Sequence, residues 1–295
     1  MQKITPHLWF DKEAKEAAGF YVSAFDEAFG RDSSDSELGQ VNTLHDTPSG
    51  TVETVGFRLL GKEFASISAG PLFKFNPSVS FTVYCKTAEE VDSLWKSFSK
   101  GGTVLMELGS YPWSKKYGWI RDRYGLSWQL SVGESREIVP TLLFVKSGKA
   151  REAIEFYASV FRDSKIKSML LYGKGEHEPE GTVKYSNFIL EGMNFSAMDG
   201  SKGHQFTFNE AISFIVNCET QEEIDYYWEK LSSVPESEQC GWLKDRFGLS
   251  WQIVPSDMGK MLASGDRKKI DRVTQSFLKM KKLDLKELQK AAEGK

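Results

Sequence analysis

Histidine is the side chain most often used for proton transfer near neutral pH, and this 295-residue chain has four histidines. His7 lies in the run ITPHLWF at 4–10, which is typical of a β-strand. It has the chemistry of a general base, but a lone histidine on a strand is more often a packed, hydrogen-bonded residue. We favour that structural interpretation. His45, His177 and His204 fall in or near expected loops, where we expect them at the surface.

Cysteine is the next nucleophile to consider, and the three cysteines are scattered along the chain. Cys85 and Cys218 alternate with Phe and Val, so both are expected in the core. Cys240 is expected to be more accessible, yet no histidine and carboxylate partners are evident for it. The odd, scattered set predicts no disulfide framework and is typical of a protein of the reducing cytoplasm.

Two glutamines occupy equivalent places in a phrase that occurs twice. Residues 118–130 read GWIRDRYGLSWQL, and residues 241–253 read GWLKDRFGLSWQI. The Asp and the Gly suit a tight turn, and LSWQL then alternates like a half-buried strand. Trp128 and Trp251 share the face expected beneath helices, whereas Gln129 and Gln252 share the opposite face. This pattern predicts that the second face lines something polar, although plain solvent exposure of the amides explains it equally well.

The elements that must position these residues are themselves duplicated. ITPHLWF at 4–10 matches IVPTLLF at 138–144, FYVSAF at 20–25 matches FYASVF at 156–161, and SFTVYCKTAEEVDSLW at 80–95 matches SFIVNCETQEEIDYYW at 213–228. The order is kept, and only the loops differ in length. The repeat is therefore a whole domain rather than a solenoid unit. We predict one domain at 1–133, a second at 137–255 and a helical tail at 256–295.

Each copy contains the pattern β-α-β-β-β twice. In the first copy we expect a strand at 4–10, a helix at 12–25 and strands at about 37–44, 51–60 and 62–69. A second strand and helix follow from Ser78, and Thr87 with Glu90 predicts a capping box at the start of that helix. The tail shows helical spacing at 270–277, and Asp284 is expected to cap a last helix. The fold class predicted from this order is α+β.

Composition narrows the function classes. The chain is 40% apolar and 27% charged, with a net charge of −3 and interspersed signs, so we expect no nucleic-acid partner. No apolar run approaches the roughly 18 residues that a membrane span needs, so we expect no membrane partner. The N-terminus lacks the layout of a signal peptide, and a cytoplasmic location is the expectation.

The sequence resembles the vicinal-oxygen-chelate superfamily of glyoxalases, bleomycin-resistance proteins and extradiol dioxygenases. More narrowly it resembles the PhnB-like family, which carries the label "3-demethylubiquinone-9 3-methyltransferase". The matching stretches are ITPHLWFDKEAKEAAGFY, NEAISFIVNCETQEEIDYYWEKL and CGWLKDRFGLSWQIVP. The resemblance implies paired β-α-β-β-β units that form a cupped mixed sheet, in two tandem domains like a homodimer fused into one chain. It also implies that the tail docks on the second domain.

Superfamily enzymes place metal ligands on the first, fourth, fifth and eighth strands of a domain. In the first copy the resemblance assigns these positions to His7, Ser66 or Ser68, Ser80 and Gln129. In the second copy it assigns them to Thr141, Ser196 or Met198, Ser213 and Gln252. Hydroxyls and amides are poor replacements for imidazole and carboxylate. We therefore expect no metal and no cofactor.

Three functions from different classes stay open: a small-molecule binding protein, an enzyme with or without a metal, and a structural or regulatory protein. We favour the first, with the ligand in the cup of one or both domains, and leave a further homodimer open. The ligand-binding candidates are His7, Trp9, Ser80, Gln129, Ser213 and Gln252. Aromatic residues that the sequence offers for a pocket are Trp9, Tyr111, Trp113, Trp119, Phe206, Phe208 and Trp242, about half of which we expect in the core. A methyltransferase is not expected, because no glycine-rich turn follows the first strand.

Overall fold

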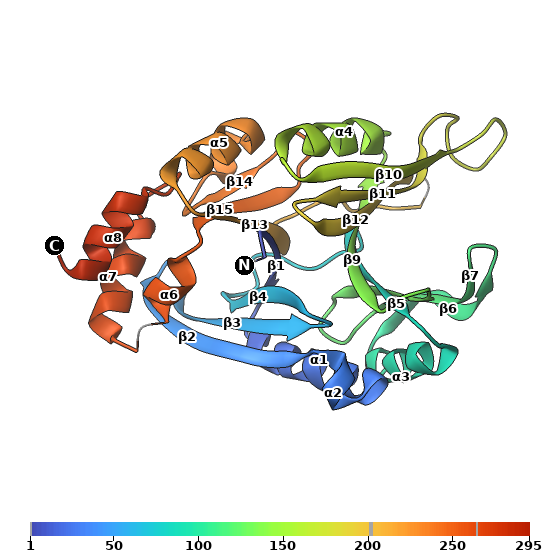
Figure 1. Ribbon diagram of the computed structural model, residues 1–295, viewed down its shortest axis with the longest axis horizontal. Helices are drawn as coiled ribbons and strands as arrows, with labels where there is room; N and C mark the ends of the chain where they lie inside the picture. Colours follow the sequence, from blue (N-terminus) through green and yellow to red (C-terminus); the bar gives the residue numbers. More distant parts are fainter. Residues whose placement is uncertain (1, 201–202, 264) are drawn as a thin grey trace.

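The computed structural model describes residues 2–200, 203–263 and 265–295, and the two repeats appear in it as four similar units (Figure 1). The first repeat consists of β1 (Ile4–Phe10), α1 (Ala14–Phe29), α2 (Arg31–Ser34), β2 (Glu37–Thr47), β3 (Gly50–Leu59), β4 (Lys62–Ser68), β5 (Val79–Cys85), α3 (Ala88–Phe98), β6 (Thr103–Tyr111), β7 (Ser114–Arg121) and β8 (Ser127–Val132). These bounds confirm the strands and helices expected for the first copy.

The second repeat and the tail follow in the same order. The repeat consists of β9 (Glu137–Val145), α4 (Ala150–Val160), β10 (Ser164–Leu171), β11 (Val183–Leu190), β12 (Met193–Gly200), β13 (Ile212–Cys218), α5 (Gln221–Leu231), the 3₁₀ turn η1 (Pro235–Ser237), β14 (Trp242–Lys244) and β15 (Ser250–Pro255). The tail holds α6 (Met258–Leu262), α7 (Arg267–Phe277) and α8 (Leu285–Glu293). Asp284 caps α8 as predicted, since its side chain accepts a hydrogen bond from the backbone N–H of Glu287.

The two sheets do not follow the repeat boundary. One has seven strands in the order β14-β15-β13-β1-β4-β3-β2, and the other has eight in the order β10-β11-β12-β9-β5-β8-β7-β6. Each sheet therefore joins one unit of the first repeat to one unit of the second. The predicted α+β class of cupped mixed sheets with C-terminal helices is confirmed. The expectation that each repeat would form a cup by itself is wrong.

The short connection between the repeats accounts for this exchange. β8 ends at residue 132 and β9 begins at 137, and β9 pairs antiparallel with β5, the first strand of the preceding unit. The first strand of the second repeat thus joins the same sheet as the second unit of the first repeat. The two outer units are left to pair with each other, which they do through the antiparallel ladder of β1 and β13. The boundaries at 133 and 137 describe the sequence repeat, and as domain limits they stay predictions.

The strand phase predicted from the repeated phrase is confirmed. Trp128 and Trp251 are 1% and 0% exposed and lie in the core beneath the helices. Each indole N–H donates to a buried carboxylate, Trp128 to Asp122 at 2.9 Å and Trp251 to Asp245 at 2.9 Å. The same carboxylates accept backbone N–H groups of the turn, so each Asp holds its turn and its tryptophan together.

The fourth unit has one strand fewer than the other three. Between α5 and β14 the chain forms only η1, whereas the matching place in the first repeat holds β6. The missing strand leaves backbone groups at this edge of the sheet unpaired, and the tail pairs with them. The N–H groups of Cys240 and Gly241 donate to the carbonyl oxygens of Met280 and Lys281, both at 2.8 Å. A side chain at Gly241 would come within 3.1 Å of Leu283 and 3.0 Å of a backbone oxygen, so this close approach requires glycine.

The tail also reaches the first repeat. α7 packs against β2, and the side-chain amide of Gln275 donates to the carbonyl oxygen of Asp46 at 3.1 Å. The tail therefore docks on the second repeat, as expected, and also on the first, because the seven-stranded sheet on which it docks belongs to both repeats (Figure 1). Among the described residues, no helix is long and apolar enough to cross a membrane.

Candidate functional site

Each sheet has one face covered by helices and a second face that forms a cup. α1 and α5 cover one face of the seven-stranded sheet, and α3 and α4 cover one face of the eight-stranded sheet. We call the opposite face of the seven-stranded sheet cup A and the opposite face of the eight-stranded sheet cup B. Because paired residues on neighbouring strands share a face, the registers place each side chain.

The floor of cup B carries a row of hydroxyl groups across three strands. Ser80 of β5 pairs with Thr141 of β9, and Thr141 pairs with Ser196 of β12. The Thr141 hydroxyl lies 2.7 Å from that of Ser196 and 2.7 Å from that of Thr82. All four residues are at least 96% buried, and each hydroxyl has a partner on a neighbouring strand or side chain.

Gln129 extends this network toward the mouth of cup B. Its amide nitrogen donates to the Ser80 hydroxyl at 2.8 Å, and its amide oxygen accepts from the Tyr117 hydroxyl at 2.8 Å. Gln129 is only 7% exposed, so the interpretation of this amide as a simple surface group is wrong. The Tyr84 and Tyr185 hydroxyls meet at 2.8 Å on the same side of the sheet. Burial raises the pKa of both Tyr84 and Tyr117, so these hydroxyls are neutral hydrogen-bonding groups at physiological pH.

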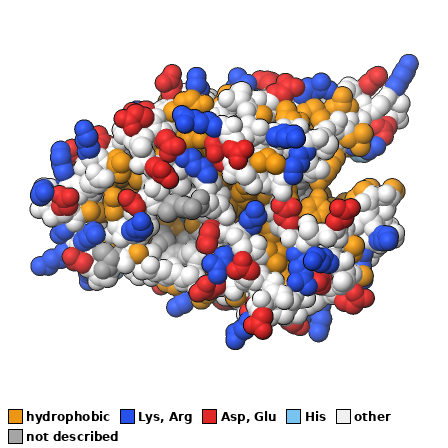
Figure 2. Space-filling view, viewed as in Figure 1, with side chains coloured by type: hydrophobic (Ala, Val, Ile, Leu, Met, Phe, Trp, Pro, Cys, Tyr) orange, Lys and Arg blue, Asp and Glu red, His pale blue; other side chains and the backbone are white. Residues whose placement is uncertain are grey.

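The mouth of cup B is open and aromatic. Trp113, on the turn between β6 and β7, is 63% exposed and stacks on Tyr111 with ring centroids 5.0 Å apart. Tyr117 meets both rings edge-on. Across the mouth, Leu170 of β10 is 57% exposed. The space-filling view shows a notch at the right-hand end of the molecule, with hydrophobic side chains along its walls (Figure 2).

The floor of cup A has the same registers but different chemistry. His7 stands in the place of Thr141, and it pairs with Ser213 on one side and Ala65 on the other. Ser213 accepts a hydrogen bond from the Gln252 amide at 3.0 Å, as Ser80 does from Gln129 in cup B. The imidazole Nδ1 of His7 and the hydroxyl of Ser250, in contrast, are buried without a hydrogen-bond partner among the described residues.

The environment of His7 explains its missing partner. The places of the Thr82 and Ser196 hydroxyls in cup B are taken in cup A by Ile215 and Ala65, which cannot hydrogen-bond through their side chains. Trp242 approaches the imidazole edge-on at 5.4 Å. Desolvation by burial lowers the pKa of His7 to about 3, so the ring is neutral at physiological pH.

The tail covers cup A. Leu44, Val52 and Ala69 form a buried apolar cluster, and Trp9 and Ile67 pack against it together with Leu262, Ile270 and Phe277 of the tail. The Trp9 indole N–H donates to the carbonyl oxygen of Gly70 at 2.8 Å, which holds the ring in this cluster. The two cups therefore differ in access as well as in their floors.

The structure divides the predicted site residues between the cups. His7, Trp9, Ser213 and Gln252 lie in cup A, whereas Ser80 and Gln129 lie in cup B. The expectation that His7 shares a site with Ser80 and Gln129 is wrong, because the sheets exchange units between the repeats.

Ser66 and Ser68, the fourth-strand candidates of the first copy, do not face a cup. Ser66 bonds the carbonyl oxygen of Val55 on the helix side, and Ser68 accepts from the first turn of α1.

Several cup residues were missed in the sequence. Thr82 and Tyr84 alternate with core residues in SFTVYC. This alternation predicts that they lie on the same face of the strand as Ser80. Tyr117 carries no such signal, because its counterpart in the second repeat is Cys240. No group of three or more His, Cys, Asp or Glu residues able to hold a metal ion is present in the part of the chain that the structure describes. Cys85 and Cys218 are buried in the core, as predicted.

Two surface cavities lie away from the cup floors. One of about 340 Å³ is lined by Glu13, Glu16, Arg123 and Tyr124 on the helix side of the first unit. Arg123 stacks over Phe20 and Tyr124 and reaches Glu16 at 3.4 Å, so its charge is already compensated. The other, of about 260 Å³, lies between β2 and the start of α7.

Comparison with known proteins gives a family and a fold. The family described as 3-demethylubiquinone-9 3-methyltransferase matches residues 2–131 and again residues 136–254. A putative 3-demethylubiquinone-9 3-methyltransferase, PhnB protein, from Bacillus cereus is 38% identical, with a TM-score of 0.39, and its whole length (100%) matches 45% of this chain. The crystal structure of protein PA1353 from Pseudomonas aeruginosa is 18% identical, with a TM-score of 0.35, and covers 43% of this chain and 93% of its own.

A glyoxalase I mutant from Zea mays matches both repeats together. It covers 88% of this chain and 97% of its own length with a TM-score of 0.51, at 12% identity. At that identity the likeness shows the fold alone. No curated protein matches the chain.

Proposed function

Starting from the fact that this chain belongs to the 3-demethylubiquinone-9 3-methyltransferase family and has the glyoxalase I fold, we propose that it binds a small molecule in cup B. The observation that carries the proposal is the contrast between the floor and the mouth of this cup. The floor is a fixed polar network built from Ser80, Gln129 and Tyr117, and the mouth is open beside the exposed Trp113. A concave site with a few fixed polar groups and aromatic walls is typical of small-molecule binding.

Methyl transfer is not part of the proposal. The family description names it, but the first strand of each repeat leads into its helix without a glycine-rich turn. The central pairs in each sheet are antiparallel, β1 with β13 and β5 with β9, unlike the parallel sheet of a nucleotide-binding fold. We therefore base the function on the site and not on the description.

A thermal-shift screen of the full chain with metabolites and metal ions tests binding, because a ligand of the native state raises Tm. We expect Gln129→Leu to abolish the shift that a cup B ligand produces, since it removes both hydrogen bonds that the amide makes to the floor. The matched control is Gln252→Leu, the same change in cup A, which should keep the shift. A ligand that stabilises both variants equally would refute binding at this floor.

The exposed Trp113 gives a second readout of the same site. Its ring should stack on an aromatic or apolar ligand, so binding should change tryptophan fluorescence. Loss of such a contact by Trp113→Ala should weaken binding about 2- to 10-fold. Since Trp113 is 63% exposed, the substitution should leave Tm of the free protein unchanged.

An enzyme is the second candidate function, and His7 is the observation that favours it. Its unpaired Nδ1 leaves a ring nitrogen for proton transfer. Burial lowers the pKa of the imidazole to about 3, however, which makes it a weak base at physiological pH. The ring is also buried, and the carboxylate that would orient a catalytic imidazole is replaced by Ser213, Ala65 and Trp242. We rank this function second for that reason.

A further inference from the structure

The tail is attached to the molecule in two different ways. The segment that leads into α8 is held by backbone hydrogen bonds from Cys240 and Gly241, and the N–H of Leu285 donates to the Gln221 side chain at 2.8 Å. Leu283 is 1% exposed in an apolar cluster of its own. This part replaces a missing strand at the sheet edge, so we expect it to be a permanent part of the fold.

The part formed by α6 and α7 is attached by weaker contacts. Leu262, Ile270 and Phe277 rest on the apolar cluster of cup A. Side-chain amides supply the hydrogen bonds to β2: Gln40 donates to the carbonyl oxygen of Ala263 at 3.3 Å, and Gln275 donates to that of Asp46. No backbone ladder joins these helices to the sheet in the described parts of the chain, so they can separate from it at a smaller free-energy cost than the segment before α8.

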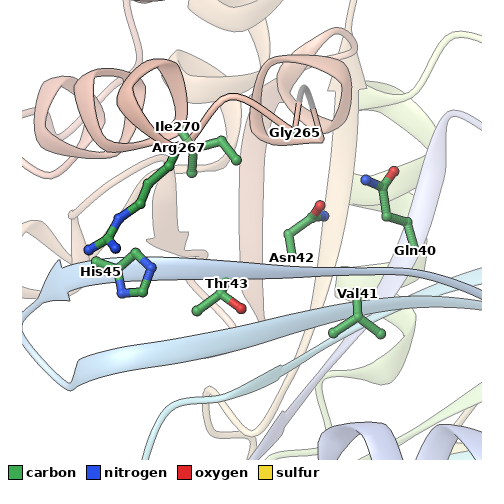
Figure 3. A pocket seen from close by; sticks show the side chains of 8 residues that line it. All are labelled: Gln40, Val41, Asn42, Thr43, His45, Gly265, Arg267 and Ile270. Carbon is green, nitrogen blue, oxygen red and sulfur yellow. The ribbon is translucent and has the colours of Figure 1, made fainter.

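The contact between α7 and β2 is also incompletely packed. The cavity of about 260 Å³ lies there, and Figure 3 shows Gln40 and Asn42 pointing up from β2 on its tail side, while Arg267 extends from the tail toward His45. Arg267 is mostly exposed, and its partner Asp271 is on its own helix, so the tail gains no ion pair with β2 from this side chain. An opening already exists where these helices would lift.

Two polar groups on the floor of cup A are left without a hydrogen bond among the described residues. His7 Nδ1 and the Ser250 hydroxyl lack partners, although their residues are 93% and 100% buried. An unpaired buried polar group destabilises the fold. In cup B the matching positions of the eight-stranded sheet are satisfied by side chains of that sheet. The tail packs on Trp9, Trp9 meets Trp242, and Trp242 meets His7 edge-on. The tail thus covers the floor through these rings and, in the parts of the chain that the structure describes, gives its unpaired groups no hydrogen bond.

From these contacts we propose that α6 and α7 form a movable lid over cup A, and that its opening admits a small uncharged molecule that hydrogen-bonds His7 and Ser250. The two residues belong to a row across β1, β13 and β15, in which Ser213 lies between them. Two strand spacings separate them, roughly 10 Å, so the molecule has polar groups at both ends. A charge is disfavoured, because the floor is desolvated and offers neutral donors and acceptors.

Chemical labelling of His7 measures lid opening directly. Diethyl pyrocarbonate acylates accessible neutral imidazoles, and peptide mass spectrometry reports each histidine separately. In the wild-type chain we expect slow labelling of His7 and fast labelling of the exposed His177. Phe277→Ala and Ile270→Ala weaken the lid contacts and should speed His7 labelling at least about tenfold, with His177 unchanged. Lys290→Ala, on α8, is the matched control and should behave as wild type.

Gln275→Ala is a milder variant for the case that the apolar substitutions unfold the tail. Gln275→Ala removes one amide hydrogen bond at an exposed position and should speed His7 labelling about 2- to 10-fold. Unchanged labelling of His7 in a folded lid variant would overturn the lid.

The probe 4-hydroxybenzamide tests the ligand class, since it is uncharged and polar at both ends. In Ile270→Ala it should slow His7 labelling at millimolar concentration, whereas terephthalate, which is similar in length but carries two negative charges, should not. Absence of protection by the amide, or equal protection by terephthalate, would overturn the binding site proposed here. Neither result depends on Gln129 or Trp113, so it is independent of the function proposed for cup B.

Discussion

The two cups are built by the same strand registers and differ in what fills their central position. In cup B, Thr141 is satisfied by hydroxyls on both sides, and the mouth is open. In cup A, His7 takes that place between Ile215 and Ala65, and the tail closes the mouth. The two repeats have kept the same scaffold while the floors of the cups have diverged. The same strand position can therefore hold a hydrogen-bonded residue in one cup and an unpaired one in the other. The side chains on the neighbouring strands decide which.

The largest effect we predict tests the scaffold that both cups share. Trp251→Ala removes a fully buried ring and should destabilise the protein by roughly 3–5 kcal/mol. Gln252→Ala, on the opposite face of the same strand, should cost much less, because that side chain fills no core. Urea unfolding curves of the two variants measure the difference. A larger loss for the glutamine variant would show that the face assignment is reversed.

The second prediction uses pH to separate the cups, because the central position of the floor is His7 in cup A and Thr141 in cup B. The pKa of His7 is about 3 in the folded chain and about 6.5 when unfolded, so the unfolded state binds more protons between these values. The contribution of His7 to stability should therefore be lost as pH falls from 6.5 toward 3, by about 2–3 kcal/mol at pH 4.5.

His7→Met, which keeps an apolar side chain in place of the imidazole, should remove this dependence. Asp122 changes stability in the opposite sense, since burial raises its pKa to about 6 and the folded state then holds the extra proton. The quantity to measure is thus the difference between wild type and His7→Met in the free energy of unfolding at pH 7.5 and pH 4.5. Equal pH dependence in both proteins would contradict the buried, neutral imidazole.

The third prediction compares the two central residues at neutral pH. Thr141→Val keeps the shape but leaves the Thr82 and Ser196 hydroxyls without their shared partner, so it should cost about 1–3 kcal/mol. His7→Met removes a group that has no partner and should be nearly neutral or stabilising. Denaturation at pH 7.5 checks both. A greater loss for His7→Met would mean that His7 holds a partner, for example a bound water, that stabilises the fold.

The smallest expected effect concerns metal content. Protein purified without chelators should hold less than one equivalent of zinc, iron, nickel or manganese, because one imidazole with neutral oxygens leaves a divalent charge uncompensated. His7→Ala should leave the content unchanged. Elemental analysis decides this prediction, and about one equivalent lost on His7→Ala would restore a metal-dependent enzyme as the leading candidate.

Local pattern was enough to predict most elements of the fold. Periodicity located the strands and helices of the first repeat, and the alternation in LSWQL placed Trp128 and Gln129 on opposite faces. Self-similarity revealed the duplication. These features depend on neighbours along the chain, whose spacing is visible in the sequence.

The elements, their faces and the number of units follow from the sequence alone, whereas the assembled fold sets which units meet. Pairing between β1 and β13, or between β5 and β9, joins residues far apart in the chain, and the repeats are similar enough to allow either partner. The same holds for the tail, whose apolar residues predict a helix but not the surface it covers. Since the use of His7, Ser80 and Gln129 depends on side chains brought from other strands, their chemistry became visible only when the sheets were assembled.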